Sequence, residues 1–477
     1  MNDKINAYIK KYLLEEYGII ESFRSNGEVE NQFTLMTETI RKQDILIKEL
    51  SRQKDTANIS GLLKRWIEFQ NTLWRFVLGE PEQLYCNYLK STKYPDQASK
   101  FENFCSRVRA ESLSTNLTTP GRLFIDVTNT CQTEKMTGIQ RVLFELSRRL
   151  IKSGAYLVLL SDKGMLFYNE VSGFQENLVF TKGDIFLMPE TGIDHSDLLE
   201  DAMSKVHDAG GMNVSIVYDL IPINYPLTCA PAVSFKFHHW LKNCALRSDL
   251  VLTNTKSVVS QIQKFAGECL SEGKFLPKID HFSLGSELPP VDPQKMTSET
   301  GKPSFPTDNI FLSVGTIEPR KGYSISLDAA DKAWRSGADF IYVIVGRYGW
   351  SQTKLKDRIL NHDLYGKKLI WFDNLNDADL AYFYRISKRL ICPSLDEGFG
   401  LPLMEAAQHG LAAIASDIPV FREVAGDRAR FFEVANHDHL AEEIILACNS
   451  PKIIAGAEPI SWNCSATDLI ERIRANR

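Results

Sequence analysis

The sequence predicts an α/β protein with two doubly wound, parallel-sheet domains. Short apolar runs that suit buried strands alternate with amphipathic helical segments from residue 123 onward. The alternation starts again at residue 310, after a polar, proline-bearing run at 288–309 that indicates a linker. Strands that alternate with helices favour a parallel sheet covered by helices on both faces. The length of 477 residues is sufficient for about two to four domains of ordinary size.

The elements of the first domain follow from apolar runs and from helical spacing of apolar residues. The segment 138–150, GIQRVLFELSRRL, is a clear amphipathic helix after a polar loop. We expect strands at 123–128, 155–161, 184–189, 214–222 and 249–254, and helices at 138–150, 233–247 and 257–265.

The second domain repeats the architecture without a visible sequence repeat. We expect strands at 310–315, 340–346, 369–372, 389–394 and 412–416, and helices at 323–336, 352–361, 377–387 and 402–409. A last helical segment, 466–477, is expected to cross back to the first domain. The predicted boundaries are 1–118 for an N-terminal extension, 119–295 and 296–460 for the two domains, and 461–477 for the tail.

Residues 1–118 differ in character from the two domains because they contain few glycines and lack strand-like runs. Apolar residues recur at helical spacing, and one stripe is rich in aromatic residues, including Trp66 and Trp74. This region is predicted to be a helical extension. Three roles remain open: packing on the rest of the chain, oligomerisation or docking of a protein partner, and contact with a membrane surface through the tryptophan-rich stripe.

Charge and cysteine content exclude some classes of protein. The formal net charge is −5 and the pI is near 6.1, so no overall basic field would attract nucleic acid. The nine cysteines are scattered singly, which favours reduced thiols over a disulfide framework. The start lacks the apolar core of a signal peptide, and no run of 18 apolar residues occurs. We expect a cytoplasmic protein, with peripheral attachment at the inner face of the plasma membrane left open.

The segment 389–407 joins a buried strand to a helix through a loop with two glycines and two carboxylates. Glu397 lies in this loop, and Pro402 suits the first helical turn because its missing N–H is not needed there. Free N–H groups at a helix N-terminus can bind a phosphate, and carboxylates accept hydrogen bonds from hydroxyls. The combination predicts a site for a sugar nucleotide.

The run from Glu397 to Glu405, EGFGLPLME, resembles the E-x7-E element of the retaining glycosyltransferases of family 4, which have the GT-B fold. The resemblance implies that Glu397 lies beside the donor sugar, that the loop amides meet the diphosphate, and that Glu405 binds the nucleotide ribose. The implied donor-binding residues in this element are Glu397, Gly398, Phe399, Gly400, Leu401 and Glu405.

A second candidate element is VGTIEPRKG at 314–322. Gly315 lets the chain turn after a buried strand, and Arg320 and Lys321 follow at the carboxyl end of that strand. Two adjacent cations there can neutralise the charge that develops on a departing nucleoside diphosphate. Family 4 enzymes are similar, with Arg and Lys in the corresponding loop. Many members also have arginine directly after the first glycine, where this chain has Thr316, which puts one phosphate contact in doubt.

The first domain offers weaker candidates. Gly138, at the start of a helix, resembles the glycine loop of the family's first domain, which approaches the donor phosphate or the acceptor. Arg141 follows in the first helical turn and faces either the site or solvent. Asp219 ends a strand where family members often carry a histidine or aspartate near the reacting centre, so we predict a catalytic contact with sugar or acceptor. The alternative for Asp219 is a helix cap.

Further donor-binding candidates are placed by the resemblance alone. Gly346 and Arg347 end a strand where the family has a loop under the nucleotide, and Asp373 and Leu375 lie where the nucleobase usually meets backbone groups. The family often has glycine near Asp373, so the identity of the base is left open.

The predicted function is transfer of a hexose from a nucleoside diphosphate sugar to a glycan or lipid-linked glycan hydroxyl, with retention of anomeric configuration. GDP-mannose is the predicted donor, and a surface polysaccharide is the expected product. The predicted catalytic residues are Glu397, Arg320, Lys321 and Asp219, with no metal and no cofactor. The alternatives are a sugar-nucleotide epimerase of the same fold and an inactive, donor-binding partner subunit.

Overall fold

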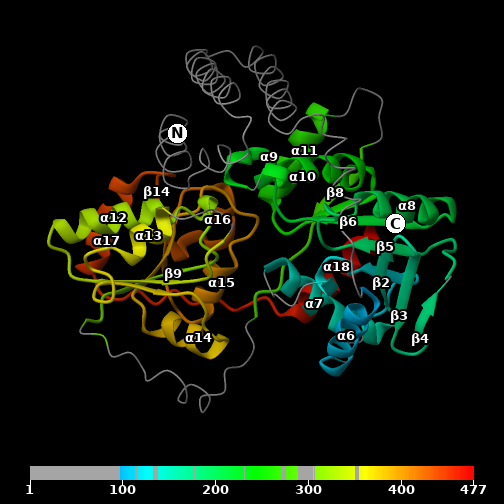
Figure 1. Cartoon of the computed structure of the whole chain (residues 1–477), viewed down its shortest axis with the longest axis horizontal. Helices are drawn as coiled ribbons and strands as arrows, with labels where there is room; N and C mark the ends of the chain where they lie inside the picture. Colours follow the sequence, from blue (N-terminus) through cyan, green and yellow to red (C-terminus); the bar gives the residue numbers. More distant parts are fainter. Residues whose placement is uncertain are drawn as a thin grey trace. The chain divides into compact units, whose positions relative to one another are not determined.

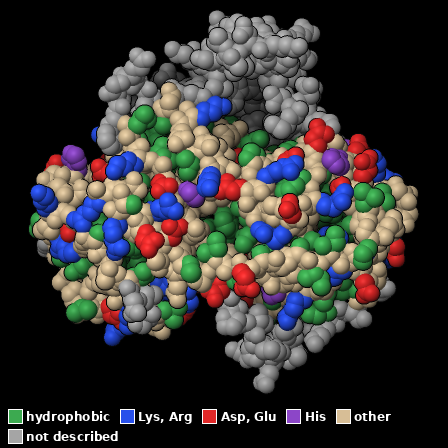
Figure 2. Space-filling model, turned by 180° about the vertical axis from the view of Figure 1, so that it is seen from behind, with side chains coloured by type: hydrophobic (Ala, Val, Ile, Leu, Met, Phe, Trp, Pro, Cys, Tyr) green, Lys and Arg blue, Asp and Glu red, His purple; other side chains and the backbone are tan. Residues whose placement is uncertain are grey.

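The computed structural model describes residues 97–477 except for 114–116, 133–137, 177, 230, 270–275, 288–304, 306 and 350–353. The predictions for residues 1–96 and for the linker at 288–304 therefore lie outside the described residues. Among the helices of the described part, none is both long enough and apolar enough to cross a lipid bilayer. Acidic and basic side chains are interspersed on the face shown in Figure 2, in keeping with the small net charge.

The first sheet has eight strands in the order β4-β3-β2-β1-β5-β6-β7-β8. The strands are β1 (Leu123–Asp126), β2 (Tyr156–Ser161), β3 (Gly164–Asn169), β4 (Gly173–Glu176), β5 (Ile185–Met188), β6 (Met212–Val217), β7 (Leu250–Thr253) and β8 (Lys278–His281). All pairings from β2 to β8 are parallel. The hairpin of β3 and β4 adds an antiparallel edge that the sequence analysis did not include.

Helices cover both faces of the first sheet because successive residues of its central strands are mostly apolar and point alternately to opposite faces. On β1, Leu123 and Ile125 pack in a cluster with α6 (Gln97–Ala110), α7 (Gly138–Leu150) and α18 (Trp462–Ala475). Phe124 packs on the other face, in a cluster with α8 (Ser196–Asp208), α10 (Pro231–Asn243) and α11 (Lys256–Cys269). The short helix α9 (Ile221–Asn224) follows β6.

The chain's last helix completes the first domain, not the second. Trp462, Leu469 and Ile473 of α18 are buried in the same cluster as the inner face of α7. Figure 1 shows the red helix α18 beside the cyan helix α7. The first-domain core therefore closes only when the end of the chain has returned to it.

The second sheet has six parallel strands in the order β11-β10-β9-β12-β13-β14. The strands are β9 (Ile310–Val314), β10 (Ile341–Val345), β11 (Leu369–Phe372), β12 (Arg389–Cys392), β13 (Ala413–Ser416) and β14 (Ala429–Phe432). The helices are α12 (Tyr323–Arg335), α13 (Lys354–Leu360), α14 (Asp377–Ile386), α15 (Leu401–Gln408), α16 (Pro419–Ala425) and α17 (His437–Cys448). The predicted fold class is confirmed: two α/β domains, each built on a parallel sheet.

The strand order of the second sheet reverses between β9 and β12. In doubly wound sheets the connections on either side of such a reversal leave in opposite directions, which opens a crevice at the carboxyl ends of the two strands. The segments that follow β9 and β12 are the two motifs singled out in the sequence. The topology therefore brings the two motifs together although they lie about 80 residues apart in the chain.

Candidate active site

A pocket lies at the point where the second sheet reverses its strand order. Its lining comes from both strand ends, from the loops that follow them, and from the first turns of α12, α15 and α16. The lining residues are Ser313, Val314, Lys321, Tyr323, Ile391, Cys392, Pro393, Ser394, Glu397, Gly400, Pro402 and Phe421. The sequence-predicted residues Lys321, Glu397 and Gly400 thus share one pocket.

The loops after β9 and β12 are joined by backbone contacts as well as by charge. The N–H of Leu395 donates to the carbonyl of Arg320 at 2.8 Å. Gly322 has φ +68°, and a Cβ there would lie 2.0 Å from the carbonyl oxygen of Pro393. Only glycine combines this left-handed backbone with so close an approach. The register of Arg320 and Lys321 against the second loop is therefore set by the backbone.

Glu397 is buried and binds both predicted cations. Its Oε2 lies 3.2 Å from Nη1 of Arg320, its Oε1 accepts from Nζ of Lys321, and Ser394 Oγ donates to Oε1 at 2.8 Å. Burial alone would raise the pKa of Glu397, but Lys321, Arg320 and the hydrogen bonds from Lys321 and Ser394 lower it to about 2. Glu397 is thus an anion at every physiological pH.

Arg320 also pairs with a carboxylate that the sequence analysis did not consider. Its Nε lies 3.1 Å from Oε2 of Glu318, which precedes it by two residues. In this structure the two cations are thus balanced by Glu397 and Glu318. A diphosphate entering the pocket would add its own negative charges beside both cations.

The first turn of α15 presents backbone N–H groups next to this charged cluster. Gly400 precedes the helix with φ +87° and ψ +55°, and Pro402 occupies its first turn. Glu405, one turn further on, is buried, and the hydroxyl of Tyr384 donates to its Oε2 at 2.7 Å. Burial raises the pKa of Glu405, and the Tyr384 bond and the charge of Arg141 oppose that rise. Tyr384 was missed by sequence reasoning, because it lies on α14 without a recognisable motif.

Residues of the first domain reach the same place. Nη1 of Arg141, on α7, lies 3.5 Å from Oε1 of Glu405, and a Cβ on Gly138 would contact Leu401 at 3.5 Å. Arg141 therefore faces the site, not bulk solvent. Both predicted first-domain loop residues meet the helix that carries the second glutamate.

Asp219 also lies against the glycine loop. A Cβ on Gly398 would be 2.1 Å from the carbonyl oxygen of Tyr218 and 3.2 Å from the Cβ of Asp219. One oxygen of Asp219 accepts from the N–H of Ile221 at 3.0 Å, so the predicted alternative of a local cap is part of its role. Burial raises its pKa, and the charge of Arg320 opposes that rise, which places the carboxylate within electrostatic reach of the cations.

Asp396 is a second missed residue. It directly precedes Glu397, is buried, and accepts from the N–H of Glu397 at 2.9 Å and from Nδ2 of Asn224 in the first domain at 3.5 Å. Burial, with added repulsion from Asp219, raises the pKa of Asp396 to about 7. Its position next to Glu397 could have indicated a role in the site, but polar residues are common in loops and this one belongs to no recognised motif.

The predicted donor residues Gly315, Gly346, Arg347, Asp373 and Leu375 are not among the residues that line the pocket. A Cβ on Gly346 would be 1.9 Å from the carbonyl oxygen of Gly315, so these two glycines allow adjacent strand ends to pack closely. Arg347 and Asp373 are exposed and Leu375 is partly buried. Their roles towards a nucleotide stay predictions.

Comparison with known proteins identifies the domain that carries the pocket. Residues 296–456 match the family described as glycosyl transferases group 1. These residues are a group 1 glycosyltransferase domain. The group 1 domain contains the two cations, the glycine loop and both glutamates of the E-x7-E element.

Similarity to individual proteins extends beyond the group 1 domain. The serotype-specific mannosyltransferase WbdA of Escherichia coli is 30% identical over 363 residues, which cover 72% of this chain and 43% of WbdA. The O-antigen chain mannosyltransferase RfbU of Salmonella typhimurium is 27% identical over 215 residues, 45% of this chain and 55% of RfbU. The chain thus spans less than half the length of WbdA. Among solved structures, Anabaena Alr3699/HepE in complex with UDP and glucose is 11% identical and covers 74% of this chain and 95% of its own. Its TM-score of 0.47 is too low for a comparison of sites.

Proposed function

We propose that this protein transfers a mannosyl residue from GDP-mannose to a hydroxyl group of a glycan acceptor, with retention of configuration, during synthesis of a surface polysaccharide. The observation that carries the proposal is the pairing of Glu397 with Arg320 and Lys321 beside the first turn of α15, at the switch point of the group 1 domain. The named activity of the relatives WbdA and RfbU supports mannose as the sugar and O-antigen-like glycan as the product.

The chemistry follows from where charge develops. Cleavage of the bond between sugar and diphosphate leaves positive character on the sugar ring and negative charge on the departing phosphate. Arg320, Lys321 and the N–H groups at the start of α15 stabilise that negative charge most strongly in the transition state, which lowers the barrier. These side chains would serve the leaving group without a metal ion. Glu397, held ionised by the same cations, orients the donor sugar.

The first domain would supply the acceptor side. Asp219 lies against the glycine loop at Gly398 and within reach of the charge of Arg320, so it can contact a sugar or acceptor hydroxyl at the reacting centre. Asp396, with its raised pKa, lies on the same boundary between the domains. We do not assign a covalent nucleophile, since the carboxylate of Glu397 is already engaged by three donors.

A transfer assay tests the proposal. The full chain is incubated with radiolabelled GDP-mannose and a mannose oligosaccharide in the presence of EDTA, and the products are separated. We expect a lengthened oligosaccharide whose new linkage keeps the anomeric configuration of the donor, as read by NMR. Free epimerised donor would instead support an epimerase, and donor binding without turnover would support an inactive binding subunit. Loss of turnover in EDTA would contradict the metal-independent mechanism.

The choice of nucleotide is tested by thermal unfolding. A ligand that binds only the folded state stabilises it by about 2.7 kcal/mol at a concentration of 100 times its Kd. We expect GDP and GDP-mannose to raise the Tm clearly more than UDP, UDP-glucose or dTDP-sugars at equal concentration. A larger shift with UDP than with GDP would reject GDP-mannose as the donor while leaving the transferase proposal standing.

A further inference from the structure

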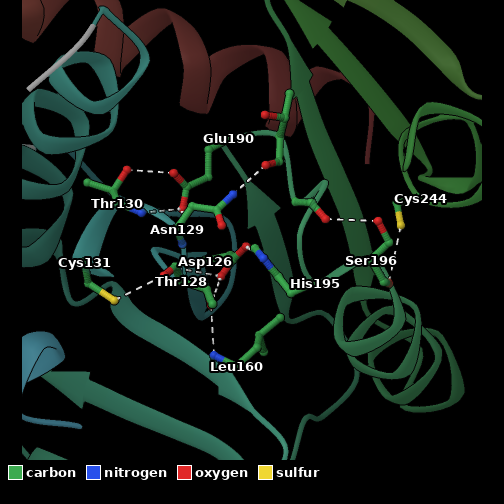
Figure 3. A network of polar contacts seen from close by, with 12 residues as sticks. Asp126, Thr128, Asn129, Thr130, Cys131, Leu160, Glu190, His195, Ser196 and Cys244 are labelled. Carbon is green, nitrogen blue, oxygen red and sulfur yellow. Dashed lines mark hydrogen bonds and ion pairs between the residues drawn. The ribbon is translucent and has the colours of Figure 1, made fainter. Parts of the chain in front are cut away.

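The first sheet also reverses its strand order, between β1 and β5. In a doubly wound sheet this is the place where a ligand crevice is expected. Here the strand ends are filled by a buried polar network, drawn in Figure 3. It contains two carboxylates, Asp126 at the end of β1 and Glu190 after β5, together with His195 at the start of α8, and all three are almost inaccessible to solvent.

Glu190 binds three donors from one turn of chain. Its Oε1 accepts from the backbone N–H groups of Asn129 at 2.8 Å and Thr130 at 3.1 Å, and its Oε2 accepts from the hydroxyl of Thr130 at 2.6 Å. The side chain of Asn129 bonds back to the carbonyl of Thr191 at 2.6 Å. The segment after β1 is therefore held against the segment after β5 by hydrogen bonds from both Asn129 and Thr130.

A second anchor lies beside the first. Oδ1 of Asp126 accepts from the N–H of Thr128 at 3.1 Å and from its hydroxyl at 2.5 Å, and Oδ2 lies 3.4 Å from Nε2 of His195. The hydroxyl of Thr128 in turn accepts from the N–H of Leu160 at 2.9 Å. The turn after β1 is thus tied to β2, to the segment after β5 and to α8.

Such a network is an expensive way to obtain stability alone. Buried charged groups often gain little over well-packed apolar residues of the same size, because removing them from water costs several kcal/mol. Burial and the charge of Asp126 raise the pKa of Glu190 to about 7, which shows that the ionised form is disfavoured at this position. Apolar residues of the same size could not form these directional bonds, and the bonds give residues 128–132 a fixed geometry.

The fixed turn leads towards the active site. Six residues after Gln132, α7 begins at Gly138, where a Cβ would contact Leu401, and its first turn carries Arg141, which pairs with Glu405. Tyr218, whose hydroxyl donates to the carbonyl of Pro189 at 2.8 Å, connects the same network to the strand end that carries Asp219. The network therefore helps to position the first-domain residues that meet the site, which are Gly138, Arg141 and Asp219.

We propose that Glu190 is a positioning residue that holds the Asn129–Thr130 turn in place and thereby shapes the acceptor side of the active site. The role is not catalytic, because Glu190 is about 2% exposed and cannot touch a substrate. The assignment of the acceptor side rests on the proposed function. The fastening of the turn by Glu190 does not, and it can be measured separately.

The test compares Glu190→Ala with Glu190→Gln. Alanine removes all three acceptors, so we expect faster hydrogen exchange at the Asn129 and Thr130 amides and an acceptor KM at least tenfold higher, measured with a mannose oligosaccharide. The affinity for GDP should stay within about twofold, since the second domain supplies the nucleotide contacts. Glutamine keeps an oxygen for the two N–H groups and its NH2 can donate to Thr130, so it should restore acceptor KM to within about threefold of the unmodified chain.

Two further variants keep the test decisive. Glu443→Gln replaces another buried glutamate, which is paired with Arg430 in the second domain, and should leave acceptor KM unchanged. Thr130→Val, which removes one of the three bonds with little change of shape, should raise acceptor KM about threefold, and it serves if Glu190→Ala does not fold.

Two results would overturn the proposal: protected amides in Glu190→Ala, or equal losses of GDP and acceptor affinity. If the unmodified chain transfers no sugar, the proposed function fails, while the exchange measurement still decides whether Glu190 holds the turn.

Discussion

Replacing Arg320 and Lys321 together by alanine is expected to lower kcat by at least about 10³-fold. Loss of one preorganised group that stabilises transition-state charge typically costs about 3–4 kcal/mol, and two groups that act on one leaving group are not additive. Both side chains converge on Glu397 in the switch-point pocket, so both charges lie where the diphosphate is expected. Single-turnover measurements with saturating donor would separate this loss in the chemical step from weaker binding.

The same double substitution should change the pH dependence of stability. The pKa of Glu397 is about 2 in the fold, below its ordinary value of 4.5, so its ionised form stabilises the fold above pH 4.5 and that contribution is lost as the pH falls towards 2. Without the two cations, burial still raises the pKa of Glu397 and only the hydrogen bond from Ser394 still lowers it, so the pKa should rise. A carboxyl group whose pKa is raised in the fold destabilises the fold as the pH rises through that pKa. The difference in Tm between the variant and the unmodified chain should therefore grow as the pH rises from 5 to 8.

Lys332→Ala is a suitable control for the loss of positive charge. Lys332 lies on α12 of the same domain and pairs with Asp438 at 2.8 Å, with both side chains about half exposed. An exposed pair of this kind contributes at most about 1 kcal/mol. We expect turnover to be unchanged in this variant. Full activity in the Arg320 and Lys321 double variant would remove the basis of the proposed mechanism.

The sequence predicted the part of the second domain that carries the site, because local signals there coincide with tertiary ones, whereas β14, α16 and α17 were not predicted. The apolar runs of β9 and β12 are each followed by glycine, proline and charged residues, and a parallel sheet necessarily gathers its strand ends at one edge. The predicted strands and the family resemblance were therefore enough to place Lys321 and Glu397 in one site, although the strand order was not predicted. The E-x7-E spacing then located both glutamates on the loop and the first turns of α15.

The contacts between the domains could not be predicted in the same way. Arg141 and Glu405 are 264 positions apart, and nothing in GIQRV shows which side of α7 meets the group 1 domain. The network around Glu190 was missed for a related reason. Its members are single polar residues from two segments that lie 60 to 69 positions apart, and each alone resembles an ordinary loop residue.

The hairpin of β3 and β4 was missed because its pattern is weak. The first half of β3, GMLFYN, is not buried, and β4, GFQE, has only four residues with exposed residues on alternate positions at the edge of the sheet. An edge strand needs neither the continuous apolar run of a buried parallel strand nor a strong alternation. Its presence changes the edge of the first sheet and leaves the candidate site untouched.

Replacing Gly398 by alanine is expected to lower kcat by about 10²-fold while each domain remains folded. A Cβ at this position would lie 2.1 Å from the carbonyl oxygen of Tyr218, far inside the contact distance of about 3.5 Å. The carbonyl oxygen is a backbone atom and the position of a Cβ is fixed by the backbone of residue 398, so the strain can be relieved only by moving the glycine loop away from the first domain by more than about 1 Å. A misplacement of that size between reacting groups can cost about 10²-fold in rate.

The loss should be largest in steps that need both domains. GDP affinity should also fall in Gly398→Ala, because Gly398 belongs to the predicted donor-binding loop, but by a smaller factor than kcat, and the bond from Thr255 to the carbonyl of Gly398 should weaken. Gly267→Ala is the matched control, because a Cβ on this residue of α11 would meet nothing within 4 Å. Undiminished transfer by Gly398→Ala would mean that catalysis does not use the close contact between the glycine loop and the strand end at Tyr218, and the assignment of Asp219 to the reacting centre would then fail with it.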